Sequence, residues 1–250
     1  RKTMILGDAT LMVLPLNGNG NGTQMKGDSV KFNPFTASCK NRVVQRTEQL
    51  LTAHSFKLRI YDQSDEAKGY TEYLLSKGEL NINYKYEIRM DINPRQIGLV
   101  FSLPSRFQAL EWERNGQWNY YPDDHIGRPK GLALATNNNP VSGPAGPVAK
   151  PQQAWAFDQN EIGTNDFRST KMNITKAALL NGLEKVIVVS DRSHSVRCWL
   201  ENGNTKMLVA SYSNMGAEGF FRSHAELIDQ PLKHGDYVSG SVQLTFTKTN

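Results

Sequence analysis

Residues 79–90 read ELNINYKYEIRM, and this stretch decides the fold class of the chain. Apolar or aromatic side chains alternate with polar ones throughout it, at Leu80, Ile82, Tyr84, Tyr86, Ile88 and Met90. Successive side chains of a β-strand point to opposite faces of a sheet, so this period of two predicts a long strand with one apolar face. An antiparallel sheet that covers a core on one side produces this pattern.

Strand signals extend outward from this segment in both directions. Further segments that alternate or are rich in β-branched residues run over 55–61, 95–103, 184–190, 196–200, 206–212, 225–228 and 239–246. Asn202-Gly203-Asn204 lies between two of them and predicts a hairpin turn. The segment 184–190 is apolar at most positions, which predicts a strand buried on both faces.

Helical periodicity is nearly absent. The best helical segment is Ile174–Leu183, but the residues that lead into it from Lys171 alternate like a strand, so its structure stays open. Many strands separated by Gly, Asn and Asp turns predict an all-β fold, a large antiparallel sandwich. We expect residues 1–250 to form one such domain, with 1–30 a flexible or linking segment and 136–153 a long surface loop. A linker between domains is the alternative for 136–153.

Charge and hydropathy exclude some classes of partner. Lys and Arg number 29 against 24 Asp and Glu, and these cations are spread along the chain without a run of five like charges. Nucleic-acid-binding domains cluster their positive charge, so no nucleic acid is expected as a partner. No apolar stretch approaches the ~20 residues of a membrane-spanning helix, so no membrane span is expected either.

The residues that could bind a metal are few and scattered. Cys39 and Cys198 lie far apart, and the five histidines form neither HxH nor HExxH. A structural zinc ion needs four ligands, so neither a metal site nor a cofactor is expected. Two buried free thiols are favoured, and a single long-range disulfide stays open.

The polar and aromatic segment Leu110–Arg128 could contact a ligand. An aromatic ring can stack on the C–H face of a sugar while carboxylates and an arginine bind its hydroxyl groups. A structural role is the favoured alternative, with Trp112 in the core. Glycoside hydrolysis needs two carboxyl groups about 5–10 Å apart, and Glu111/Glu113 share a face if they lie on a strand. That pair and Asp123/Asp124 are weak candidates because adjacent carboxylates usually mark exposed positions.

A family resemblance rests on this same segment. Trp112, Gly116 and Tyr121-Pro122-Asp123 resemble the W-x-x-x-G-x-x-x-x-Y-P-D signature of the C-terminal, small-chain domain of family 2 β-galactosidases. The stretches 93–99 and 163–168 also resemble segments that flank the signature in that family. The likeness covers about residues 55–247 and is most specific over 93–131.

The resemblance implies a β-supersandwich like that of the galactose mutarotase superfamily. It implies an accessory domain of a glycoside hydrolase, packed on a catalytic barrel outside these residues and forming one wall of its sugar cleft. Trp118, Tyr120 and Asp123 would form this wall, with Arg168 and Lys171 on a neighbouring loop. The catalytic groups would belong to the barrel, so no catalytic residue is assigned here and the chain alone is not expected to be catalytic. The start at Arg1 fits a piece cut from a longer protein. The sequence leaves the localisation open, and the resemblance favours a periplasmic or extracellular parent enzyme.

Two other functions stay open. A free-standing carbohydrate-binding module would bind sugar by itself through an exposed aromatic platform. An enzyme of mutarotase or polysaccharide lyase type would need a histidine acid and a carboxylate base in one concave face. His194 or His224 with Glu226 would have to supply those groups.

Overall fold

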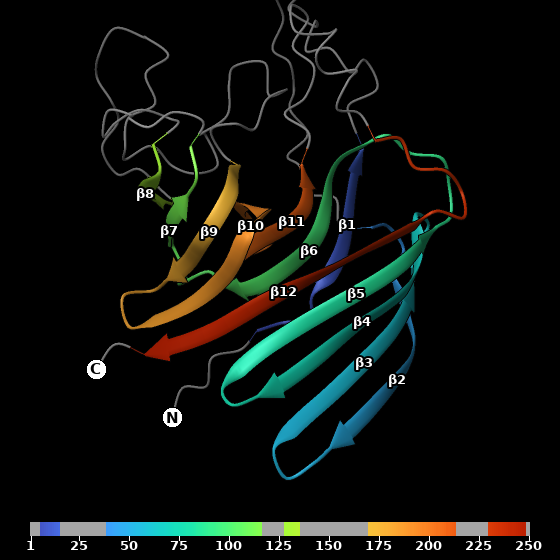
Figure 1. Cartoon of the computed structure of the whole chain (residues 1–250), viewed down its shortest axis with the longest axis horizontal. Coiled ribbons are helices and arrows are strands. Elements are labelled where there is room, and N and C mark those ends of the chain that lie inside the picture. The colour runs from blue at the N-terminus through green and yellow to red at the C-terminus, as the bar shows by residue number, and fades with distance from the viewer. Residues whose placement is uncertain (1–5, 16–38, 117–127, 136–169, 214–229, 249–250) are drawn as a thin grey trace, which may run out of the picture.

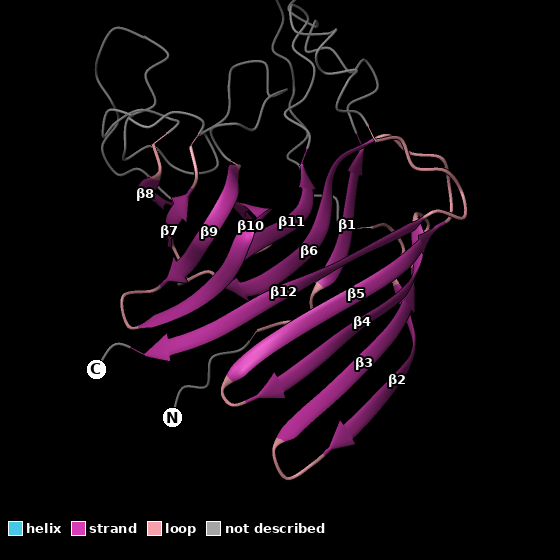
Figure 2. Ribbon diagram, viewed as in Figure 1, coloured by secondary structure: helices cyan, strands magenta, loops and turns pink. Residues whose placement is uncertain are grey.

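The computed structural model describes residues 6–15, 39–116, 128–135, 170–213 and 230–248. Within these ranges every regular element is a strand (Figures 1 and 2). The strands are β1 (Thr10–Pro15), β2 (Val43–Leu51), β3 (Ser55–Gln63), β4 (Ala67–Ser76), β5 (Glu79–Ile88), β6 (Pro94–Pro104), β7 (Ala109–Arg114), β8 (Lys130–Leu134), β9 (Lys171–Leu180), β10 (Glu184–Glu201), β11 (Asn204–Ser213) and β12 (Tyr237–Lys248).

All the strand pairs are antiparallel, and the strands belong to one connected sheet. Its main path runs β1-β6-β11-β10-β12-β5-β4-β3-β2, while β9 joins β10 to β7 and β7 carries β8 at the edge. The predicted all-β fold, built on a large antiparallel sheet, is therefore confirmed. In the described part of the chain, no helix is long and apolar enough to cross a membrane.

The long strand β10 is the point at which the sheet divides. Its first part, Glu184–Val189, pairs with β12, and its last part, Ser195–Glu201, pairs with β11. Strand β9 follows the other edge of β10, and the register between them breaks between Val189 and His194. The strands β12 and β11 thus leave the same edge of β10 in different directions and form a fork at 190–194 (Figure 1).

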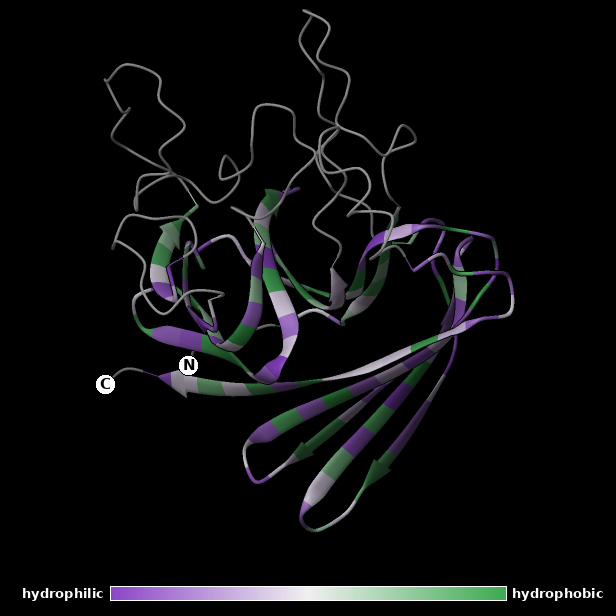
Figure 3. Ribbon diagram, turned by 45° about the horizontal axis from the view of Figure 1, so that its top comes forward, coloured by the Kyte–Doolittle hydropathy of each residue, from purple (hydrophilic) through white to green (hydrophobic). Residues whose placement is uncertain are grey.

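The core lies on the apolar face of the alternating strands. In β5, Ile82, Tyr84, Tyr86 and Ile88 are buried, whereas Lys85 on the opposite face is exposed. Figure 3 shows the same alternation of hydrophobic and hydrophilic residues along the layer that holds β2 to β5. The buried tyrosine hydroxyls have partners: the Tyr84 oxygen lies 2.6 Å from Ser211 Oγ, and the Tyr86 oxygen lies 2.9 Å from Thr71 Oγ1.

One segment differs from the expectation, and one that was left open is settled. Thr10–Pro15 falls within the segment expected to be flexible or linking, yet it forms β1 because its apolar run pairs with β6 and is buried there. Lys171–Leu180 forms β9 and not a helix, since both of its edges are taken up by β7 and β10. The expected strand 225–228 and the expected loop 136–153 lie outside the described residues.

Strand β10 also differs from the prediction that 184–190 is buried on both faces. Val186 and Val188 are fully buried, but Val189 is 42% exposed on the other face. Only one side of this part of the sheet is covered in the described structure, so its apolar residues reflect β-propensity as well as burial.

Candidate functional site at the polar end of the sheet

Strands β1, β7 and β11 end, and β6, β8 and β9 begin, at one end of the sheet. The polar side chains gathered there define the polar end of the sheet: Gln96, Arg128, Thr170, Lys171, Arg197 and Ser213. All but Ser213 are buried, with exposed fractions of 8% or less. Burying a charge is costly unless it is paired or hydrogen-bonded, so this group of residues needs a specific role.

Trp112 of β7 is the aromatic centre of the polar end. Its ring is only 2% exposed, which confirms the prediction that it belongs to the core. The Arg128 guanidinium carbon lies 4.9 Å and the Lys171 Nζ 4.6 Å from a ring centre, within the range of cation–π attraction. A Cβ atom on Gly131 would lie 2.3 Å from Trp112 Cζ2, so only glycine lets β8 approach the ring.

Gln96 of β6 connects four strands or strand ends by hydrogen bonds. Its Nε2 donates to Thr170 Oγ1 at 3.2 Å and to Ser213 Oγ at 3.3 Å. Its Oε1 accepts from Arg197 Nε at 3.1 Å. One amide therefore ties β6, β10, β11 and the residue that precedes β9 into a rigid base.

A second set of hydrogen bonds closes the base of the segment between β7 and β8. The backbone N–H of Arg114 donates to the Pro129 carbonyl at 2.7 Å, and its Nε donates to the Arg128 carbonyl at 3.1 Å. The Asn115 N–H donates to the Asn173 carbonyl at 3.1 Å. The described residues on either side of 117–127 are thus bonded to one another and to the sheet.

The predicted sugar-contact residues relate to this base in different ways. Trp118, Tyr120, Asp123 and Arg168 lie outside the described residues. Lys171 is described, and it is buried against Trp112 at the start of β9. Sequence reasoning did not single out Gln96, although two polar residues, Arg95 and Gln96, at the start of the mainly apolar strand 95–103 were a signal.

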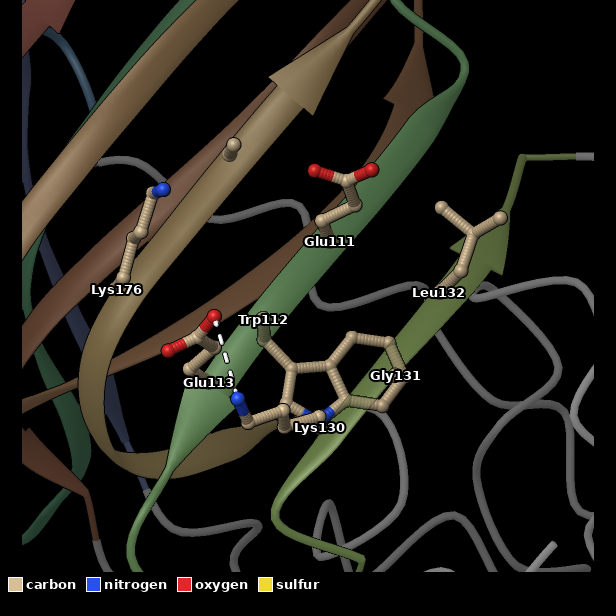
Figure 4. Close-up of a pocket in the computed structure, with 8 residues that line it drawn as sticks. Glu111, Trp112, Glu113, Lys130, Gly131, Leu132 and Lys176 are labelled. Atoms are coloured by element: carbon tan, nitrogen blue, oxygen red, sulfur yellow. Dashed lines mark ion pairs between the residues drawn. The ribbon is translucent and has the colours of Figure 1, made fainter. Parts of the chain in front are cut away.

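Glu111 and Glu113 lie on one face of β7, as their spacing of two residues predicted. They line an open hollow of about 440 Å³ with Lys130 and Lys176 (Figure 4). Glu113 pairs with Lys130 at 3.8 Å and Glu111 pairs with Lys185 at 3.3 Å, and both carboxylates are about half exposed. Solvated carboxylates that each pair with a lysine do not form the enclosed acid–base pair that glycoside hydrolysis requires.

The two cysteines are free thiols, as the sequence favoured. Burial raises the pKa of the Cys39 thiol to about 12. Burial also raises the pKa of the Cys198 thiol, against the positive charges of Arg197 and Lys171, which lower it. Neither thiol is therefore a ready nucleophile. Among the residues that the structure describes, no three His, Cys, Asp or Glu side chains come together as metal ligands.

Comparisons with known proteins find only distant structural similarity. No protein-family model matches the chain, and no curated protein matches it. A proposed aldose 1-epimerase from Escherichia coli K12 is 10% identical, with a TM-score of 0.42 over 82% of this chain and 69% of that one. A galactose mutarotase related enzyme from Lactobacillus acidophilus is 12% identical, with a TM-score of 0.36 over 82% and 72%.

A galactose mutarotase-like protein from Lactobacillus casei is 9% identical, with a TM-score of 0.37 over 80% of this chain and 72% of that one. At such identities and scores the likeness assigns neither a reaction nor a ligand, and the all-β class of this chain rests on its own strands. The relation to family 2 glycoside hydrolases stays a prediction.

Proposed function

We propose that the chain is an accessory carbohydrate-recognition domain of a larger carbohydrate-active enzyme, of the family 2 glycoside hydrolase type that its Trp112–Asp123 signature resembles. The observation that carries this proposal is the buried polar end, where Arg114 and Arg128, on either side of the segment with Trp118, Tyr120 and Asp123, are held by hydrogen bonds and by contact with Trp112. When the residues that flank a binding segment are held in place, less conformational entropy is lost on binding a ligand.

The chemistry of the site favours recognition over catalysis. The described polar residues at this end are buried cations, an amide and hydroxyl groups. Their bonds stabilise a base on which sugar-contacting side chains can be held in place. Glu111 and Glu113, the described carboxylate pair that we considered for catalysis, are each about half exposed and each pair with a lysine.

An exposed apolar row supports the accessory role. Leu51, Phe56, Leu75 and Leu80 lie opposite one another across β2, β3, β4 and β5, and Leu80 packs against the core. Leu51 is 78% and Leu75 43% exposed. A contiguous apolar surface that continues the core outward is typical of a domain that packs on another domain.

Trp118→Ala should abolish sugar binding at the polar end or weaken it at least about tenfold, since an aromatic ring offers a large apolar contact area to a sugar. The measurement is calorimetric titration of the folded chain against a glycan panel, with sugar release and anomer interconversion assayed on the same samples. Glu111→Gln, in the open hollow that Glu111 and Glu113 line, is the control and should bind as the wild type does. Turnover by the chain alone, or full affinity in Trp118→Ala, would contradict the proposal.

Leu51→Asp should leave the stability of the isolated chain within about 0.5 kcal/mol of the wild type, because the position is exposed. In the parent enzyme the same change should cost about 1–3 kcal/mol, because the aspartate would be buried against the neighbouring domain. Leu183→Asp, at a position 64% exposed in the turn between β9 and β10, is the matched control. Equal melting temperatures of the parent enzyme with either change would argue against docking through this row.

A further inference from the structure

A second hollow lies at the fork of the sheet, separate from the polar end. It has a volume of about 400 Å³ and is lined by residues of β10, β12 and β5. The polar residues that matter here are Asn81, Ser190, Asp191, His194, Ser241 and Gln243. Since β12 and β11 leave β10 at this point, the hollow results from the division of the sheet and not from a loop.

The part of the hollow formed by β12 and β5 is on the face turned away from the core. Val188 and Leu244 are paired and fully buried, whereas their neighbours Val189 and Gln243 are paired on the opposite face and line the hollow. Asn81 lies opposite Gln243 in the adjacent pair of strands. Two amide side chains and the exposed Val189 thus share one small surface.

His194 is held in a defined position within this hollow. Its Nδ1 lies 2.9 Å from Ser190 Oγ and 3.1 Å from Ser193 Oγ. Burial lowers the pKa of its imidazole, although the Ser241 carbonyl and the Asp191 carboxylate act in the opposite direction. The ring is therefore mainly neutral at pH 7 and adds hydrogen-bonding capacity without a positive charge.

The neighbouring arginine is directed elsewhere. Arg192 has a φ of 83°, an uncommon value for a residue other than glycine. With the Asn115 amide oxygen turned toward it, Arg192 donates from Nε at 3.1 Å and from Nη1 at 3.2 Å, to a residue just beyond β7. No lysine or arginine is among the described residues that line the hollow, and Asp191 is its charged group.

We propose that this hollow is a second binding site, for one unit of a neutral, hydroxyl-rich ligand such as a saccharide. Amide and hydroxyl groups both donate and accept hydrogen bonds, as sugar hydroxyls do. A carboxylate can accept hydrogen bonds from two hydroxyl groups. The methyl groups of Val189 offer an apolar contact for the C–H face of a ring. An anionic ligand would meet Asp191, and also Glu79, whose Oε2 accepts from Gln243 Nε2 at 3.2 Å.

The test is an NMR titration of the ¹⁵N-labelled chain with the methyl glycosides of glucose, galactose and mannose. At least one glycoside should shift the amide signals of 190–194 and 241–243. Asp191→Asn and Gln243→Leu should each weaken this binding at least about tenfold, because hydrogen bonds to charged or buried polar groups are the strongest available here. Gln63→Leu at the end of β3 and Asp65→Asn in the turn before β4 make the same chemical changes away from the hollow. Both variants should bind as the wild type does.

The outcomes separate this site from the polar end. Trp118→Ala should leave the shifts at 190–194 and 241–243 unchanged even if it abolishes binding at the polar end. No shift at these residues up to the solubility of each glycoside would overturn the proposal, and so would equal affinity in Asp191→Asn. Asp191 is exposed, so that variant is expected to fold and decides the question even if Gln243→Leu does not fold.

Discussion

Replacing Trp112 with alanine is expected to lower the free energy of unfolding by about 3–5 kcal/mol. Trp112 is 2% exposed and its ring packs against Arg128 and Lys171, with Gly131 close to its six-membered ring. Its loss removes buried apolar area, leaves a cavity and takes away the surface on which two buried cations lie. We also expect sugar binding to fall, because Arg128, which directly follows the segment 117–127, lies against this ring.

Equilibrium unfolding in urea, followed by circular dichroism, measures the effect. Trp112→Phe keeps an aromatic face for the two cations and should cost clearly less than Trp112→Ala. Trp112→Ala with a loss of under about 1 kcal/mol would show that the ring does not support the core. A Trp112→Phe variant as unstable as the alanine variant would instead show that shape, and not aromatic character, matters at this position.

Replacing Gly98 with alanine is expected to destabilise the chain by about 1–3 kcal/mol or more. A Cβ atom at this position would lie 2.2 Å from the Val209 carbonyl oxygen and 2.5 Å from Ala210 Cα. Both are backbone atoms and cannot rotate away. The close approach has a local cause, because the register between β6 and β11 shifts between Ala210 and Tyr212, directly opposite Gly98.

The melting temperature of Gly98→Ala compared with Gly7→Ala measures this strain. A Cβ atom on Gly7 would meet Ser102 Cβ at 3.4 Å, an ordinary contact, so that variant should melt close to the wild type. Equal melting temperatures of the two variants would mean that β6 and β11 can separate at the bulge without cost. A large loss only in Gly98→Ala would confirm that the bulge requires glycine.

The two proposed sites differ in what holds them. The polar end rests on buried side chains that bond across four strands or strand ends, so its disruption should also cost stability. The hollow at the fork is lined mainly by partly exposed polar residues on strands that are already paired. Variants there should change binding with little effect on stability, which makes the two sites separable by experiment.

The strands were predictable where local pattern and burial agree. The alternation of 79–90 determined β5 and its buried face, and Asn202-Gly203 determined the turn between β10 and β11, because both depend on neighbours in the chain. β2 gave no such signal, since all nine of its residues are exposed. It forms because its backbone pairs with β3, and a sequence pattern does not report backbone pairing.

The tertiary structure alone decided the sites. Gln96, Thr170, Arg197 and Ser213 come from distant parts of the chain, and their hydrogen bonds exist only because β6, β10 and β11 lie side by side. The fork that brings His194 beside Ser241 likewise arises because one edge of β10 pairs with two strands in succession. The sequence by itself determined which face of each strand is apolar, because the alternation of side chains depends on neighbours in the chain. Where the polar groups meet was decided by the pairing of strands that are distant in the sequence.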